Sequence, residues 1–395
     1  MKKQTGFLKI DFDTNRIYGL DILRAMSILF VVATHGNNLL PAKNNPIGYF
    51  IFDGVSIFFV LSGFLIGGIL IKILEEKEPS LKNLLDFYSR RWLRTLPNYF
   101  LILSLLVFLA YFFTAEFKFS EIYKYYLFSQ NLYTPHPGFF PEAWSLSIEE
   151  WFYLTIPAIF FFLVGVFHTP VKRTVLITAV VVLLLSISFR YFRYSQITVE
   201  TINEWDLLYR KQVVTRLDSL MFGVIGAYIS YYYKSSWLRH KDILLILGLI
   251  ALITTKLMTI FELNGLGLYY CVFSFTVTAV GTLFLLPFLS EFKSGSGILY
   301  RGLTYISITS YSMYLINLSV VQVWMLRHLP SLNLPKIPYL IGNYLLYWVF
   351  TLVGGILIYK YYEKPIMDLR GKIKLFEAGT LINTVNKIVT RRQHP

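Results

Sequence analysis

Apolar runs of about 20 residues recur along the whole chain, and they constrain the fold more than any other feature. A helix needs about 20 mostly apolar residues to cross the hydrocarbon core of a bilayer. The chain has 395 residues, of which 55% are hydrophobic, and its mean hydropathy is +0.54. Soluble proteins of this length rarely have such a composition. The sequence therefore predicts an all-α, multi-pass bundle of transmembrane helices.

Hydropathy predicts about ten membrane-spanning helices. The predicted spans are 18–38, 49–72, 96–115, 145–167, 174–190, 212–233, 242–261, 266–289, 303–325 and 338–361. Of the 37 lysines and arginines, 25 lie in segments predicted to be inside and 9 in segments predicted to be outside. This asymmetry predicts that both termini are cytoplasmic. We expect a cytoplasmic N-terminal segment (1–17), a membrane domain (18–370) and a basic cytoplasmic tail (371–395).

Composition also narrows the classes of function. The opening MKKQTGFLKIDFDTNR is not expected to be a signal peptide, because the apolar run after it is too long and no small-residue cleavage site follows. The single cysteine, Cys271, lies in an apolar run, so we predict neither a disulfide framework nor a metal site. The net charge of the chain is +14. Basic residues are enriched in the cytoplasmic loops of membrane proteins, so this charge does not predict a nucleic-acid partner.

The first span carries three ionisable residues, although each charge near the centre of a membrane helix costs about 2.5–3.5 kcal/mol. Arg24 and His35 lie within about 20° of the same helix face and about 16 Å apart along the axis. Asp21, one turn before Arg24, is predicted to pair with it. The alternative for Asp21 and Arg24 is that they reach the inner interface. For His35, the alternative is a hydrogen-bonded position in the core.

Two other spans contain intramembrane charges. Glu149 and Glu150 open the fourth span and point about 100° apart, so both are not expected to face lipid. Arg216 and Asp218 lie in the sixth span, where a structural pair joining helices is an equally good interpretation.

A basic stretch, LLDFYSRRWLRTLP, precedes the third span at residues 84–97. Its arginines are Arg90, Arg91 and Arg94. They are typical of an interfacial helix on the inner face of the membrane. Guanidinium groups also bind phosphates through two parallel hydrogen bonds, so the same cluster is a candidate phosphate clamp.

Small and polar residues mark two further spans. In the second span, Gly63 and Gly67 form a GxxxG pattern that predicts close helix packing, and Ser62 adds a small polar group. The ninth span is too polar to face lipid. Its polar residues, which we expect to line the protein interior or a cavity, are Ser310, Tyr311, Tyr314 and Asn317.

The predicted outer segment 123–144 is rich in aromatic rings, amides and prolines. Aromatic faces suit sugar rings, and Asn131 is a candidate partner for sugar hydroxyls. An aromatic belt at the membrane interface is at least as good an interpretation. His136, between two prolines, is a weak alternative candidate for a general base.

Taken together, these stretches resemble the acyltransferase 3 family of bacterial membrane acyltransferases. The family's motifs are matched in order by GLDILR with a later histidine (19–35), FFVLSGFL (58–65), the basic loop (90–94), WSLSIEEWFY (144–153), RLDSLMFG (216–223), SYSMYL (310–315) and EKP (363–365). One departure is Asn317, which stands where many members have a histidine. The extracytoplasmic hydrolase-like domain of some larger relatives is also not expected here.

The resemblance implies an O-acyltransferase of the bacterial inner or plasma membrane that moves an acyl group, usually acetyl, from acyl-CoA to a hydroxyl of a cell-surface or lipid-linked glycan. It implies His35 as general base or transient acyl carrier, aided by Arg24, Asp21 and Glu149. Donor phosphates would bind Arg90, Arg91 and Arg94, and no metal is implied. The implied acceptor contacts are Trp144, Asn131, Ser62 and Tyr311, and the implied structural residues are Arg216, Asp218 and Glu363.

Other classes of function remain as alternatives. A transporter or flippase would use midplane charges to bind substrate or relay protons, but it should show discontinuous helices in corresponding halves. A glycan polymerase or lipid-linked sugar transferase would not need acyl-CoA. A structural scaffold explains none of the charges inside the spans.

Overall fold

The computed structural model describes residues 16–40, 46–114, 119–260, 265–329 and 335–369. The predicted basic tail (371–395) and most of the N-terminal segment (1–17) lie outside these residues. Within the described residues the secondary structure is helical and contains no strand, which confirms the all-α prediction.

Ten long helices form the body of the protein. They are α1 (Tyr18–Asn37), α2 (Gly54–Glu76), α3 (Leu81–Phe113), α5 (Ala143–Gly165), α6 (Val171–Gln196), α8 (Leu217–Tyr232), α10 (Lys241–Ile260), α11 (Ser274–Glu291), α12 (Gly297–Ile316) and α13 (Lys336–Ile358). The short helices are α4 (Tyr123–Tyr126), α7 (Ile202–Trp205), α9 (Lys234–Arg239) and α14 (Lys364–Leu369). The 3₁₀ segments are η1 (Pro46–Phe50), η2 (Phe119–Glu121) and η6 (Leu326–His328). The π-helical segments are η3 (Asp206–Arg210), η4 (Tyr269–Phe273), η5 (Asn317–Met325) and η7 (Tyr359–Glu363).

In the part of the chain that the structure describes, 9 helical stretches are long and apolar enough to cross a membrane. The remaining predicted span, the sixth (212–233), corresponds to α8, which has 16 residues and is shorter than a full crossing. Two predicted boundaries were wrong. The fifth span is longer than expected, because α6 has 26 residues. The basic stretch at 84–97 is not a separate interfacial helix, because it forms the first part of the 33-residue helix α3.

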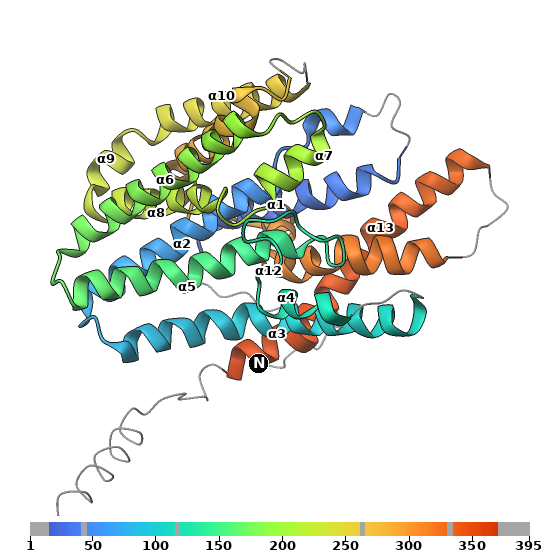
Figure 1. The fold of residues 1–395 in the computed structure, drawn as a ribbon, viewed down its shortest axis with the longest axis horizontal. Coiled ribbons are helices and arrows are strands. Elements are labelled where there is room, and N and C mark those ends of the chain that lie inside the picture. The colour runs from blue at the N-terminus through green and yellow to red at the C-terminus, as the bar shows by residue number, and fades with distance from the viewer. Residues whose placement is uncertain (1–15, 41–45, 115–118, 261–264, 330–334, 370–395) are drawn as a thin grey trace, which may run out of the picture.

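The long helices lie side by side with broadly aligned axes, with α10 along one edge of the bundle and α3 along the opposite edge (Figure 1). Helix α2 is central and packs against α8, α1, α11 and α5. Helix α10 packs mainly on α11, which leaves most of its apolar side chains exposed. The apolar surface of this edge is therefore the surface that would face lipid.

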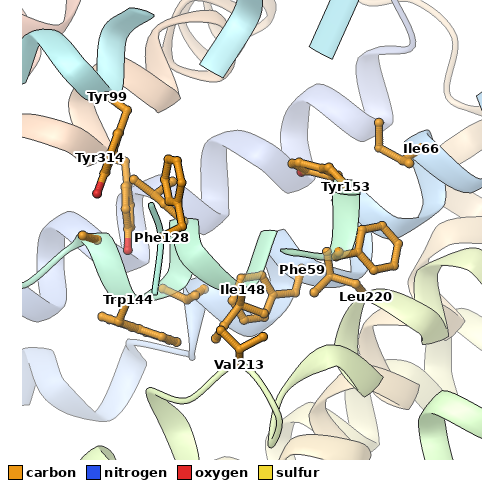
Figure 2. Close-up of a cluster of buried hydrophobic side chains, with 14 of the residues drawn as sticks. Phe59, Ile66, Tyr99, Phe128, Trp144, Ile148, Tyr153, Val213, Leu220 and Tyr314 are labelled. Carbon is orange, nitrogen blue, oxygen red and sulfur yellow. The ribbon is translucent and has the colours of Figure 1, made fainter. Parts of the chain in front are cut away.

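The main core cluster joins α2, α3, α5, α8 and α12. Figure 2 shows Phe59, Leu220 and Ile66 toward one side of this cluster, and Tyr99 and Tyr314 toward the other. Helix α5 lies between the two groups and contributes residues to the whole cluster. The polar residues of α5 are therefore held inside the protein by the packing of their apolar neighbours.

Glycines set the distance between α2 and α8, as the GxxxG pattern predicts. A Cβ atom added to Gly63 would lie 1.8 Å from the carbonyl oxygen of Leu220. One added to Gly223, on the facing helix, would lie 2.1 Å from the carbonyl oxygen of Val60. Backbone atoms cannot move aside as flexible side chains can, so any side chain at these positions would push the helices apart.

Replacing Gly63 by alanine is therefore expected to destabilise the folded protein by about 1–3 kcal/mol, the usual cost of overpacking. The measurement is thermal unfolding of the purified protein in detergent. Gly68 is the matched control, because it lies on the same helix and an added Cβ would meet nothing within 4 Å. Equal stability of the Gly63→Ala and Gly68→Ala variants would contradict this account of the packing.

Candidate active site

Three cavities follow one another through the bundle. The His35 cavity has a volume of about 400 Å³ and is lined by residues of α1, α2, α7, η3, α10, η4 and α11. The Arg24 cavity, of about 240 Å³, shares Val55 with the His35 cavity. The Arg90 cavity, of about 280 Å³, shares Arg91 and Arg94 with the Arg24 cavity. The two candidate residues of α1, which their spacing places on a shared face, thus line two adjacent cavities rather than the two ends of one.

His35 is held by a hydrogen bond to the residue that departs from the family pattern. Its Nδ1 atom lies 2.5 Å from Oδ1 of Asn317. The amide nitrogen of Asn317 donates to the carbonyl oxygens of Tyr314 (2.7 Å) and Met313 (3.2 Å), so its Oδ1 is the atom left to accept. Nδ1 of His35 must then carry the proton, and Nε2 is left with its lone pair. This is the tautomer that a general base or nucleophile at Nε2 requires.

Glu142 holds the helix turn that carries Asn317. Helix α12 changes to the π-helical segment η5 at Asn317, and this change frees backbone N–H groups. The carboxylate of Glu142 accepts from the N–H groups of Leu318 (3.0 Å) and Ser319 (2.7 Å), and from the Ser319 hydroxyl. Burial raises the pKa of Glu142 to about 7, although these hydrogen bonds oppose the shift. Glu142 is not among the residues predicted from sequence.

Removing the acceptor atom of Asn317 should weaken the orientation of His35. We expect Asn317→Leu to lower kcat by about tenfold, the equivalent of one hydrogen bond of ~1.4 kcal/mol. Asn317→Asp keeps an oxygen for Nδ1–H and should retain more activity than Asn317→Leu. Steady-state kinetics of the acyl transfer that the family resemblance implies would measure both. If the two variants have the same kcat, the Asn317 oxygen does not orient the imidazole.

The predicted pairing of Asp21 with Arg24 was wrong. Asp21 forms an ion pair with Arg16 and accepts a hydrogen bond of 2.6 Å from the hydroxyl of Ser307. Arg24 lines the Arg24 cavity and makes no hydrogen bond or ion pair with any residue that the structure describes. Asp21 therefore fixes the start of α1 against α12, while the guanidinium of Arg24 is available to a ligand.

The basic stretch supplies two of its three arginines to the Arg24 cavity. Arg91 and Arg94 line it, whereas Arg90 is exposed and lines only the Arg90 cavity. Arg91 lies 3.9 Å from the ring centre of Tyr153 and donates to its hydroxyl. Its Nη2 atom lies 4.0 Å from Oε2 of Glu149. One carboxylate thus faces several cations, which leaves this cavity positively charged.

Glu149 lies in the Arg24 cavity, and the structure does not bring it to His35. Its Oε1 accepts a hydrogen bond of 3.0 Å from Ser62. Ser62 and Tyr311 also line this cavity, where the Tyr311 hydroxyl donates to the carbonyl oxygen of Thr95 at 2.7 Å. The side chain that contacts Nδ1 of His35 is Asn317. Ser62 and Tyr311 adjoin the arginine cluster and are separate from the His35 cavity.

Three residues of the predicted outer segment do not line any of these three cavities. Trp144 is 4% exposed and packs against Phe59. Asn131 is fully buried and donates to the carbonyl oxygens of Trp144 (3.0 Å) and Lys211 (2.7 Å). His136 is also buried, and burial lowers its pKa to about 3. The hydrogen bonds of Asn131 thus join the segment after α4 to the first turn of α5 and to Lys211.

A charged network beside His35 was missed from the sequence. Arg210 lies 3.4 Å from a carboxylate oxygen of Asp53 and 3.0 Å from one of Asp206. Burial alone would raise the pKa of Asp206, but the charges of Arg210 and Lys211 hold it below its usual value. Asp53 caps α2 by accepting from Ser56. The only sequence signal was a pair of basic residues, 210 and 211, in a predicted outer loop.

The structural pair of Arg216 and Asp218 is not formed. Asp218 pairs instead with Arg190 of α6 at 2.7 Å, and both side chains are fully buried. Arg216 donates to the Ser56 hydroxyl at 2.6 Å and lies 4.0 Å from the ring centre of Phe275. Arg216 and Asp218 therefore do join helices, as the sequence predicts. Their partners, Ser56 and Arg190, could not be read from the sequence.

Glu363 lies where a structural role is expected. It is buried and accepts hydrogen bonds from the side chains of Asn98 (3.0 Å) and Ser312 (2.5 Å). It thereby joins η7 to α3 and α12. Among the residues that the structure describes, no group of three or more His, Cys, Asp or Glu side chains is placed to hold a metal ion.

Comparison with known proteins gives a family match over most of the chain. The family model of an acyltransferase domain matches residues 17–360. The chain is 35% identical to peptidoglycan O-acetyltransferase OatA of Listeria monocytogenes over 153 residues, which cover 35% of this chain and 23% of that protein. It is 28% identical to O-acetyltransferase OatA of Staphylococcus aureus over 224 residues, which cover 53% of this chain and 34% of that protein. The matched segments thus span about a third or less of these relatives. No solved structure matches.

Proposed function

Because this chain belongs to the acyltransferase 3 family, we propose that it is a membrane O-acetyltransferase that acts on a hydroxyl of a cell-wall or other surface glycan. The relatives named as O-acetyltransferases support the acetyl group, and the name of the Listeria relative supports a peptidoglycan acceptor. Family membership also favours an enzyme over the transporter and scaffold alternatives. The observation that carries the proposal is the succession of three cavities, two of which are lined by Arg24, Arg90, Arg91 and Arg94 while the third contains His35.

We assign acetyl-CoA as the donor. Its phosphates are anionic, and the Arg90 and Arg24 cavities together contain four arginines against two carboxylates, Asp86 and Glu149. If both termini are cytoplasmic, these two cavities are on the cytoplasmic side, where acyl-CoA is made. The pantetheine arm would then extend through the Arg24 cavity toward Val55, which also lines the His35 cavity.

The chemistry is assigned to Nε2 of His35. In direct transfer, Nε2 removes the proton of the acceptor hydroxyl, and the hydroxyl oxygen attacks the thioester carbonyl. The C–S bond then breaks, and the CoA thiolate takes up the proton from the imidazolium. In the covalent alternative, Nε2 itself attacks the thioester carbonyl, the C–S bond breaks, and CoA leaves as its thiolate; the acceptor hydroxyl then displaces the imidazole, and its proton passes to the thiolate. Both routes need the lone pair that the hydrogen bond to Asn317 leaves on Nε2.

The test uses the purified protein in sealed vesicles with labelled acetyl-CoA on the face that carries the Arg90 cavity. Peptidoglycan fragments are supplied on the opposite face. We expect label to appear in the glycan as a base-labile ester. Label transfer that is equally fast with acetyl phosphate and without CoA would argue against the assigned donor. Absence of both donor binding and transfer would argue against an acyl-CoA-dependent enzyme.

A further inference from the structure

One lysine in a membrane-spanning helix faces the His35 cavity. Lys256 lies on α10, whose apolar side chains are mostly exposed along the lipid-facing edge of the bundle. A lysine within such a helix costs about 2.5–3.5 kcal/mol near the membrane centre. Lys256 lines the cavity together with Thr255 and Thr259 of the same helix. The polar face of α10 is thus turned toward the cavity.

Among the residues that the structure describes, Lys256 has no partner, whereas the other full charges of the cavity do. Arg210 and Asp53 pair with each other, and Arg210 also pairs with Asp206. Lys256 makes no hydrogen bond or ion pair with any residue that the structure describes. With His35 neutral, the cavity lining carries two cations and one carboxylate. A half-buried cation that has no partner among the described residues favours an anionic ligand.

The rest of the lining suits a sugar. Trp205 stacks on Phe275 with ring centres 5.3 Å apart and packs against Tyr270. The same cavity is also lined by a set of small polar groups, namely Thr34, Asn38, Thr255, Thr259, Ser274 and Thr278. The volume of about 400 Å³ lies within the usual range for a small-ligand site. An aromatic wall with convergent polar groups is the surface that a glycan unit requires.

We propose that Lys256 binds an acidic group on the acceptor, so that the enzyme selects glycans carrying a carboxylate or a phosphate near the acetylated hydroxyl. This inference rests on the proposed function and narrows its substrate class. The lysine would contribute to acceptor binding rather than to the chemistry at His35. A lysine that only reaches from the end of α10 to the membrane interface would leave acceptor binding unchanged.

The experiment measures glycan binding directly, by calorimetry on the whole protein in lipid nanodiscs. The probes are a peptidoglycan tetrasaccharide with free lactyl carboxylates, its methyl ester, and a glycerol phosphate oligomer. We expect wild-type protein to bind the free acid about tenfold or more tightly than the ester, as a hydrogen bond between charged groups allows. Lys256→Met should remove this preference, and Lys256→Arg should keep most of it. Lys241→Met, which removes a lysine from the start of the same helix, is the control and should behave as wild type.

The outcomes separate this inference from the proposed function. Selective binding of the acid that depends on Lys256, without acetyl transfer, would support the inference and count against the function. Acetyl transfer to both probes, with the acid and the ester bound equally tightly, would support the function and count against the inference. Selective binding of the glycerol phosphate oligomer alone would identify phosphate as the acidic group. If Lys256→Met changes the affinity for no probe, or if no probe binds, the inference is wrong.

Discussion

Replacing His35 by alanine is expected to reduce acetyl transfer by about 10²–10⁴-fold, the usual contribution of a positioned general base. The variant should remain folded and inserted, because His35 lines a cavity and is only partly buried. Its loss removes the hydrogen bond to Asn317 but leaves that side chain bound to two carbonyl oxygens. Transfer from labelled acetyl-CoA in sealed vesicles measures the effect.

His136→Ala is the matched control, because it removes the other histidine considered as a base, which lies outside the His35 cavity. Its kcat should remain close to that of the wild type when corrected for folded protein. Wild-type rates of transfer in His35→Ala would exclude both roles assigned to His35. A comparable loss in His136→Ala would mean that the wrong histidine has been assigned.

The same experiment distinguishes the two routes open to His35. If the acyl group rests on Nε2, brief incubation of the wild type with labelled donor and no acceptor should leave label on the protein, and addition of acceptor should release it. If His35 acts only as a base, CoA release and glycan labelling should occur together, and no label should remain on the chain. Retention of label by His35→Ala would place any covalent intermediate on another residue.

The helices could be predicted from sequence because hydrophobic length is a local property. Nine stretches of the described residues meet the length and hydropathy of a membrane span, and the one other predicted span, 212–233, is the short helix α8. The errors came where tertiary packing changes local expectations. Helix α3 continues through Pro97, because the loss of one hydrogen bond inside a packed bundle does not end a helix. Helix α6 continues beyond the predicted end of its span at Arg190, whose charge is compensated by Asp218.

The candidate site could be predicted in part, because positions on one helix follow from its period. The spacing of Arg24 and His35 predicts a shared face, and both line cavities. The partners of these residues come from distant parts of the chain and have no local signature. Asp21 forms an ion pair with Arg16 rather than with Arg24. His35 forms a hydrogen bond with Asn317, which lies 282 residues later in the sequence. The presence of asparagine in place of histidine at 317 was visible, but its contact with His35 was not.

Arg24 is better placed to bind the donor than to stabilise the oxyanion of a thioester at His35. The two residues are about 16 Å apart along α1. Helical side chains lean toward the N-terminus of their helix, so Arg24 leans away from His35 and toward Arg91 and Arg94. These three arginines line one cavity. Their combined charge would hold the phosphates or the polar part of the donor arm while the acyl group lies near Val55 and His35.

Arg24→Ala is therefore expected to raise the KM for acetyl-CoA by about 10–100-fold, equivalent to a lost charge-assisted hydrogen bond pair of ~1.5–3 kcal/mol, with a smaller change in kcat. Arg24→Lys should recover only part of the affinity, because an ammonium group cannot form the bidentate contact. Initial rates over a range of acetyl-CoA concentrations measure both constants.

A truncated donor turns this result into a test of what the arginines bind. Acetyl-pantetheine keeps the thioester and the arm but has no phosphate, so wild-type protein should use it with a high KM. If Arg24 and Arg94 bind phosphate, neither Arg24→Ala nor Arg94→Ala should raise the KM for acetyl-pantetheine further. The loss of donor affinity from each substitution and the loss from removing the phosphates would then be non-additive. Arg173→Ala is the control, because Arg173 lies at the start of α6 and lines none of the three cavities. Arg24→Ala could instead lower kcat equally with both donors and leave both KM values unchanged. Arg24 would then act in the transition state, and the thioester would have to bind much nearer to Arg24 than to His35.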